Sequence, residues 1–141
     1  MRVILLVSLI FVLLACATKK AQDGSSQNTV DFDAPFKITQ KKGVQFENDD
    51  LKLSFDAITE DSRCPEGATC VWEGQAKAAL TVTTKSGSEK IVMVRKGGQK
   101  ENSVAEVGHY RIYLVAVNPY PKEGATIEPA DYKLSLIVKQ K

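Results

Sequence analysis

The residues with the most distinctive chemistry lie in one short segment, residues 61–76, which reads DSRCPEGATCVWEGQA. Its two cysteines, Cys64 and Cys70, could form a disulfide, carry out thiol redox chemistry or bind zinc. Their spacing is not the Cys-x-x-Cys of redox-active pairs. A zinc site needs about four ligands, and the single histidine, His109, would raise the number only to three. The pattern therefore favours a structural loop over redox or zinc chemistry.

Asp61 and Arg63 add a second kind of chemistry to this segment. A guanidinium matches a carboxylate with two parallel hydrogen bonds, so the pair could either hold a ligand or brace the loop. We favour bracing, because polar networks of this kind rigidify the backbone around them. Pro65 bends the loop, and Gly67 can take a positive φ without steric strain.

A third cysteine, Cys16, follows an apolar run at the N-terminus. Met1-Arg2 and the almost unbroken apolar residues 3–15 have the layout of a secretory signal. The apolar run is too short for a membrane span, which needs about 20 residues. Residues 13–16, Leu-Leu-Ala-Cys, resemble the lipobox of bacterial lipoproteins. The resemblance implies cleavage of a signal peptide, residues 1–15, and attachment of two or three acyl chains to Cys16. The alternative is an ordinary cleaved signal that leaves an unpaired thiol.

In an exported chain whose Cys16 carries lipid, Cys64 and Cys70 are the only cysteine pair left, and we predict a disulfide between them. Chain-entropy arguments give a bridge across so small a loop about 2 kcal/mol of stabilisation. Trp72 lies two residues after Cys70. On a strand it would point to the same side as that cysteine and pack over the bridge.

Residues 16–32 are predicted to be the lipidated cysteine and a tether, since residues 17–29 contain no aromatic and no branched aliphatic side chain. Removal of Arg2 with the signal leaves 18 Lys and Arg against 17 Asp and Glu. This balance predicts no nucleic-acid partner and no anionic-membrane surface. Ala17 is not the aspartate that often retains lipoproteins in the inner membrane, so the outer membrane is favoured if the host is diderm.

Residues 33–141 are predicted to form one domain in which apolar and polar residues alternate. The alternation covers residues 51–57, 76–82 and 132–138, and it is typical of antiparallel strands with one face on a core. Seven or eight such strands, separated by turn-forming residues, predict an all-β antiparallel β-sandwich with immunoglobulin-like proportions. A small β-barrel is the alternative closure.

Three further segments give weaker predictions. Residues 91–94 and 110–117 are apolar on both faces, so we expect them to be central strands of a sheet or to lie between layers. Residues 99–107 could form one turn of helix.

A run of the form Asp-Ser-Arg-Cys-Pro, followed after a few residues by Cys-x-Trp-x-Gly-x-Ala, stands at residues 61–65 and 70–76. It resembles a motif of small, uncharacterised bacterial lipoproteins and secreted proteins. The stretch from Tyr110 into Asn-Pro-Tyr-Pro and the last strand fit the same group, so the likeness covers most of residues 50–138. Glu73 stands where the group more often has alanine. The resemblance implies the β fold and an envelope location, and it transfers no catalytic residue.

Other residues allow chemistry that competes with plain structural roles. His109 could serve a hydrolase, but no Gly-x-Ser-x-Gly elbow occurs, and a surface or strand-end histidine is favoured. Glu47, Asp49 and Asp50 could hold Ca²⁺, but this segment first predicts a hairpin turn. Four aromatic residues could line a sugar- or peptide-binding face or else cover the core: Trp72, Tyr110, Tyr113 and Tyr120.

These observations predict a lipid-anchored, non-catalytic protein of the bacterial cell envelope, a monomer with no cofactor and no metal. The leading hypothesis is a binding or structural module for an envelope protein or glycan, with these candidate loop residues: Asp61, Arg63, Pro65, Glu66 and Trp72. The second is an inhibitor or protective protein that displays residues 65–69, favoured if Glu66 and Thr69 face solvent. The third is a small envelope hydrolase that depends on His109.

Overall fold

The computed structural model describes residues 28–47 and 49–141. Three predicted features lie outside the described residues: the signal peptide at residues 1–15, the lipidation site Cys16, and the tether as far as residue 27.

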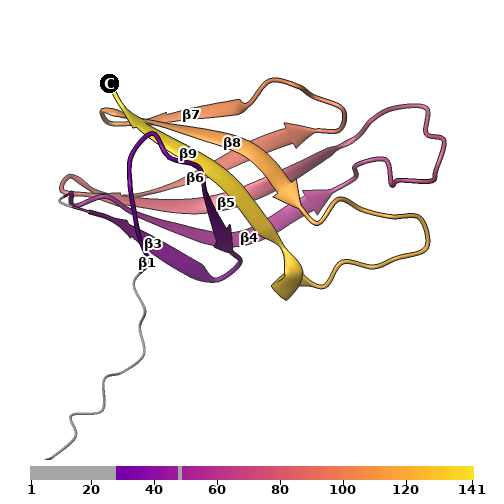
Figure 1. Cartoon of the computed structure of the whole chain (residues 1–141), viewed down its shortest axis with the longest axis horizontal. Coiled ribbons are helices and arrows are strands. Elements are labelled where there is room, and N and C mark those ends of the chain that lie inside the picture. Colours follow the sequence, from indigo (N-terminus) through magenta and orange to yellow (C-terminus); the bar gives the residue numbers. More distant parts are fainter. Residues whose placement is uncertain (1–27, 48) are drawn as a thin grey trace, which may run out of the picture.

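The alternating sequence forms nine strands within this part of the chain, arranged in two sheets (Figure 1). The first sheet has the order β1-β3-β4-β5-β6, with these bounds: β1 Asn28–Val30, β3 Lys42–Phe46, β4 Lys52–Asp61, β5 Gln75–Thr84 and β6 Gly87–Lys96. The second has the order β2-β9-β8-β7, with these bounds: β2 Phe36–Thr39, β9 Lys133–Gln140, β8 Tyr110–Asn118 and β7 Ser103–Val107. All paired strands are antiparallel except β1 and β3.

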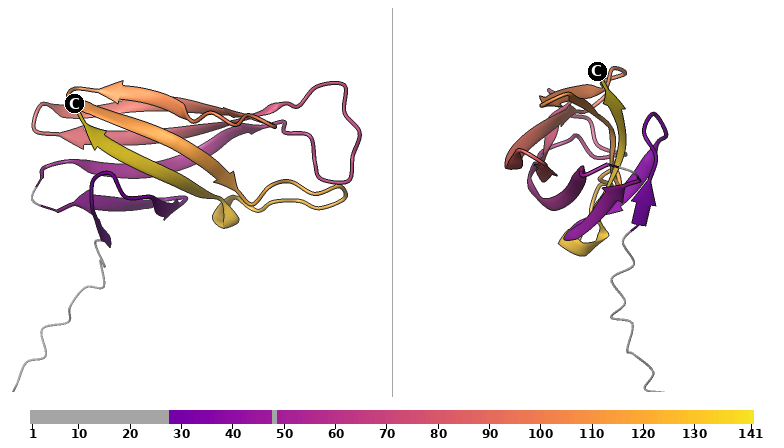
Figure 2. Two further views of the ribbon diagram at one scale, coloured as in Figure 1. Left: turned by 45° about the horizontal axis from the view of Figure 1, so that its top comes forward. Right: turned by 90° about the vertical axis from the view of Figure 1, so that its left-hand side faces the viewer.

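The two sheets are separate layers around one core, and neither closes on itself (Figure 2). The fold is therefore the predicted antiparallel β-sandwich, and the alternative of a small closed barrel is wrong. Strand alternation fills the space between the layers from both sides, because inward-facing positions recur every second residue.

The core contains the residues that the alternation predicted except Ala57, because an irregularity in β4 between Phe55 and Ala57 shifts the strand register there. On β5 every second side chain is buried, as the following four show: Ala76, Ala78, Leu80 and Val82. The same holds on β9 for Leu134, Leu136 and Val138. Burial of one large apolar side chain is worth about 1.5–3 kcal/mol relative to exposure, so this pattern specifies which face of each strand turns inward.

The two segments that are apolar on both faces differ in position. Residues 110–117 lie on β8, which is placed between β7 and β9 as predicted. Residues 91–94 lie on β6, which is an edge strand, so their predicted central position is wrong. Met93 faces the core, whereas the neighbouring Val92 is exposed on the outer face.

The predicted helical turn at residues 99–107 is also wrong, because residues 103–107 form strand β7. Ala105 and Val107 pair with Ile112 and Tyr110 of β8 across a tight turn at Gly108. Pairing with the long apolar strand β8 outweighs the weak local preference of this short segment. Within the described residues the one helical element is a 3₁₀ turn, Pro129–Asp131.

The sandwich begins earlier than the predicted boundary at residue 33. β1 pairs in parallel with Val44–Phe46 of β3, and Val30 packs against the core. The Phe32 ring stacks on Phe46, with centroids 4.7 Å apart, and lies 5.9 Å from the Tyr110 ring. Residues 28–32 therefore belong to the folded body rather than to the tether, because Val30 and Phe32 supply apolar surface that the core can bury.

We expect Phe32→Ala to lower the free energy of unfolding by about 1–3 kcal/mol, less than for a fully buried phenylalanine because Phe32 is half-buried. Chemical denaturation followed by circular dichroism measures this loss. The neighbouring exposed residue gives the control, Asp31→Ala, which should change stability little. Equal losses in the two variants would contradict the assignment of Phe32 to the fold.

Candidate functional site

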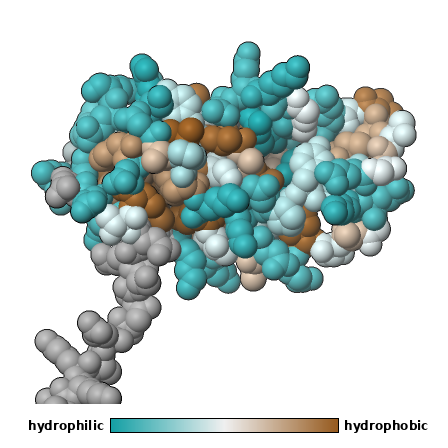
Figure 3. All heavy atoms as spheres, viewed as in Figure 1, coloured by the Kyte–Doolittle hydropathy of each residue, from teal (hydrophilic) through white to brown (hydrophobic). Residues whose placement is uncertain are grey.

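Two long connections project from the same end of the sandwich, as Figures 1 and 2 show. Residues 62–74 join β4 to β5, and residues 119–132 join β8 to β9. We call these two segments together the loop end. Figure 3 shows apolar atoms on the surface at this right-hand end of the molecule. There Val71 is fully exposed and Trp72 is 78% exposed.

The backbones of the two connections are bonded to each other. The Glu66 N–H donates to the Pro121 carbonyl at 2.9 Å, and the Glu123 N–H donates to the Glu66 carbonyl at 3.0 Å. These bonds fix one side of the loop, while the Glu66 side chain itself faces solvent. Each connection therefore limits the motion of the other.

The predicted disulfide between Cys64 and Cys70 is present, with the two Cα atoms 5.9 Å apart. Within the bridged loop Pro65 is half-buried, and Gly67 has the positive φ, 94°, that its lack of a side chain allows. Thr69 is exposed, as is Glu66. The loop is consequently presented to solvent rather than covered by another strand.

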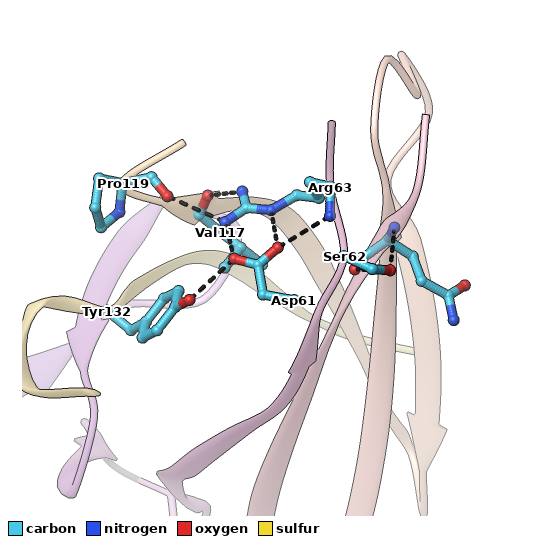
Figure 4. Close-up of polar contacts among 7 residues, drawn as sticks. Asp61, Ser62, Arg63, Val117, Pro119 and Tyr132 are labelled. Carbon is cyan, nitrogen blue, oxygen red and sulfur yellow. Dashed lines mark hydrogen bonds and ion pairs between the residues drawn. The ribbon is translucent and has the colours of Figure 1, made fainter. Parts of the chain in front are cut away.

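Arg63 is the centre of the polar network beneath this loop (Figure 4). Its side chain is 2% exposed and makes a bidentate pair with Asp61, at 2.7 Å from Nε to Oδ1 and 2.6 Å from Nη2 to Oδ2. Nη1 donates to the Val117 carbonyl at 2.6 Å, and Nη2 donates to the Pro119 carbonyl at 3.1 Å. One side chain thus ties the end of β4 to the end of β8.

Asp61 extends the network to the start of β9. Its carboxylate accepts a hydrogen bond from the Tyr132 hydroxyl at 3.0 Å, as Figure 4 shows. These bonds of Arg63 and Asp61 join the end of β4 to β8 and to the residue before β9, so the pair braces the loop. The brace could not be seen in full from the sequence, because Val117, Pro119 and Tyr132 lie far along the chain.

The network also shifts the pKa values of its members. Burial by itself raises the pKa of Asp61, but the hydrogen bonds and charge of Arg63, with the Tyr132 hydroxyl, outweigh burial and hold that pKa below its usual value. Burial and the hydrogen bond to Asp61 raise the pKa of Tyr132 to about 12. The network is therefore built for an ionised aspartate and a protonated tyrosine.

The Gly-x-Ala part of the motif has a structural explanation. Gly74 has φ of 66°, and a side chain there would overlap the Ser62 carbonyl oxygen. This close approach lets the two chain segments stay paired beyond the end of β4 and before the start of β5. There the Cys64 N–H donates to the Glu73 carbonyl at 2.9 Å. Ala76 is completely buried and pairs with Asp61, so a larger residue there would add volume to an already packed core.

Trp72 does not pack over the disulfide, contrary to the prediction. That prediction assumed a strand, but β5 begins only at Gln75, so strand alternation does not orient Trp72. Cys70 is itself exposed and offers no buried surface for the indole to cover. The Trp72 side chain instead stands on the surface of the loop end.

A depression of about 640 Å³ adjoins Trp72, and we call it the Trp72 depression. Its walls come from the loop and three strand ends, and these residues line it: Glu60, Ser62, Trp72, Glu73, Gly74, Gln75 and Lys96. Sequence reasoning missed Glu60, Gln75 and Lys96 as site residues. No local sequence pattern marks these three residues. They become neighbours through the strand register, which pairs Asp61 with Ala76 and Gln75 with Lys96.

The remaining candidate residues do not join this site. His109 is exposed at the β7–β8 turn, with its ring centroid 3.9 Å from that of Tyr110. Asp49 accepts hydrogen bonds from the Tyr110 hydroxyl and the Leu51 N–H, so it holds the β3–β4 turn. Between residues 28 and 141, Asn48 apart, no group of three or more His, Cys, Asp or Glu side chains is placed to hold a metal ion.

The four aromatic residues weighed for a binding face do not form one. Tyr110 is buried in the core, and Tyr113 is half-buried. Tyr120 lies at the loop end, 37% exposed, with the Arg63 guanidinium 5.0 Å from its ring centroid. Only Tyr120 therefore shares the loop end with Trp72.

Comparisons of the chain with protein-family models, with curated proteins and with solved structures found no match. The resemblance to the lipoprotein group, which covers most of residues 50–138 and is most specific at residues 61–76, thus remains a prediction. No helix in the described part of the chain is long and apolar enough to cross a membrane.

We expect Arg63→Ala to destabilise the fold by about 3–5 kcal/mol, because it leaves the Asp61 carboxylate buried without its partner. Denaturant unfolding curves measure this effect. The matched control is Arg111→Ala, whose pair with Glu106 is about half exposed and should matter little because solvent screens it. A loss at Arg63 no greater than at Arg111 would rule out the brace.

The low pKa of Asp61 predicts how stability depends on pH. In the unfolded chain this carboxyl has the ordinary aspartate pKa of about 3.8, whereas the folded chain keeps it ionised to lower pH. Its contribution is present above about pH 4 and is lost as pH falls through the folded pKa. The stability gap between the native chain and Asp61→Asn should therefore narrow below about pH 4. A gap that stays constant as the solution is acidified from neutral pH would count against the ion pair.

Proposed function

We propose that this protein is a lipid-anchored, non-catalytic module of the bacterial cell envelope, which binds an envelope protein or glycan through its loop end. The observation that carries the proposal is the exposure of Val71 and Trp72 on a loop that is fixed from beneath by the disulfide and by Arg63. The proposal includes a monomeric chain, a membrane attachment through acylated Cys16, no cofactor and no nucleic-acid partner.

Rigidity of the loop end supports binding. A loop that is already ordered loses little conformational entropy when it meets a partner, so more of the contact energy appears as affinity. Tryptophan is among the residues that contribute most to binding when a partner covers them. The fold gains little from an indole that is 78% exposed, so its stability does not account for Trp72.

The position of the anchor also supports this proposal. The described chain begins at β1, and the loop end projects from the opposite part of the sandwich in Figure 1. A lipid on Cys16, joined to β1 by a short segment, would leave the loop end accessible to other envelope components.

An inhibitor or protective protein is the second candidate, and the exposure of Glu66 and Thr69 favours it. The backbone bonds of Glu66 to Pro121 and Glu123 leave residues 68–72 as the part that could enter a partner's cleft. Inhibition of a purified envelope protease that is lost when Thr69, Val71 and Trp72 are replaced by serine, with Cys70 and its disulfide kept, would favour this candidate.

A photo-crosslinking amino acid placed at position 71 of the full-length chain, in its own host, tests the binding proposal. We expect covalent products, identified by mass spectrometry, that the same amino acid at position 88 does not give. Ser88 is also exposed but lies at the other end of the sandwich. Identical products from the two positions, or none from position 71, would refute binding through the loop end.

Cell fractionation tests the anchor separately. The native chain should sediment with membranes, and the Cys16→Ser variant should appear in the soluble fraction, because it lacks the acyl chains. A variant that still sediments with membranes would show that Cys16 is not the anchor.

A further inference from the structure

The Trp72 depression lies on the outer face of the first sheet, at the end nearest the loop. Gln75 of β5 pairs with Lys96 of β6, and Glu60 of β4 pairs with Lys77 of β5. The alternate residues Ala76 and Ala78 are buried, so these polar side chains occupy the solvent face. Its volume, about 640 Å³, lies within the usual range of small-molecule sites, about 300–1,000 Å³.

The polar groups of the depression are held in place by one another. Glu60 Oε2 pairs with Lys77 Nζ at 2.6 Å, and Glu60 Oε1 accepts a bond from Gln75 Nε2 at 3.2 Å. Hydrogen bonds from Lys77 and then Gln75 lower the pKa of Glu60, so its carboxylate stays ionised. The Ser62 hydroxyl also donates to Glu60 Oε1, at 3.4 Å. A carboxylate has about four acceptor sites, so these three bonds leave it able to accept another.

The Trp72 side chain adds an aromatic surface to these polar groups. An indole face carries negative charge in its π system, which attracts the partly positive C–H groups of an apolar ring face. A pyranose ring offers such a C–H face together with a rim of hydroxyl groups. Carboxylate, amide and ammonium groups beside the indole can bond that rim, and their mixed charges suit a neutral ligand.

We propose that the Trp72 depression binds a pyranose unit of a neutral oligosaccharide, stacked on Trp72 and hydrogen-bonded by Glu60, Gln75 and Lys96. This inference rests on the proposed binding function and names its ligand class as a glycan. Contact of Trp72 with an anionic lipid surface is disfavoured, because the carboxylates of Glu60 and Glu73 would face the charged headgroups.

Trp72 is the single tryptophan of the chain, so intrinsic fluorescence reports on this site alone. The full-length protein, in a detergent without sugar headgroups, is titrated with three tetrasaccharides: those of β-1,4-linked N-acetylglucosamine, β-1,4-linked glucose and α-1,4-linked glucose. We expect at least one to give a saturable spectral change with a dissociation constant of about 1 mM or tighter.

Calorimetry then measures binding in variants. We expect Trp72→Ala to abolish binding, Trp72→Phe to restore part of it, and Gln75→Ala to weaken it about tenfold through loss of one bonded group. Two matched controls should bind as the native chain does, namely Val104→Ser, an exposed apolar residue on β7, and Gln140→Ala, an exposed amide on β9. Circular dichroism verifies that each variant is folded.

No spectral change with any of the three sugars, or calorimetric binding that survives Trp72→Ala, would overturn the inference. In either case crosslinking at position 71 still decides the proposed function independently. Products from position 71 that contain only protein, combined with no sugar binding, would retain a binding module and reject the glycan.

Discussion

The buried pair of Arg63 and Asp61 is the interaction on which the loop end depends. Arg63 bonds two backbone carbonyls at and just after the end of β8, those of Val117 and Pro119, and Asp61 accepts the Tyr132 hydroxyl at the start of β9. The pair thereby joins the two sheets at the point where regular strand pairing stops. A guanidinium suits this position because its donors lie in one plane and can reach several acceptors at once.

Three other features of the loop end restrict its backbone in addition to this pair. The disulfide restricts the loop within itself, and the bonds of Glu66 to Pro121 and Glu123 join the loop to the second connection. Gly74 allows the two arms of the β4–β5 hairpin to come together above the brace. Covalent, polar and steric constraints therefore act on one short segment, whereas the side chains of Val71 and Trp72 remain outside all of them.

Much of the sandwich could be predicted from the sequence, because alternation along β4, β5 and β9 is a local signal that burial then enforces. The disulfide likewise follows from residue types, and Gly67 has the positive φ that its residue type permits. β1 and β7 were missed, since each is a short strand stabilised by a partner, β3 or β8, that the local pattern does not reveal. The edge position of β6 also depends on the order of strands in the sheet, which the periodicity of a single strand does not indicate.

The candidate site likewise has features that could be predicted from the sequence and features that could not. The roles of Asp61 and Arg63 followed from their chemistry, but their backbone partners required the fold. The orientation of Trp72 was predicted wrongly because it depends on loop backbone rather than on strand alternation. Glu60, Gln75 and Lys96 come from three different strands, so only the register places them beside one indole.

The collision that any side chain at position 74 would have with Ser62 gives a criterion for comparing this chain with related sequences. A homologue with a larger residue there must open the hairpin arms, so its loop would have another shape. Position 72 is subject to no such steric limit, since its side chain stands in solvent. Variation at residue 72 in chains that keep Asp61, Arg63 and Gly74 would therefore leave the architecture of the loop end unchanged, and under the proposed function it would record a change of ligand.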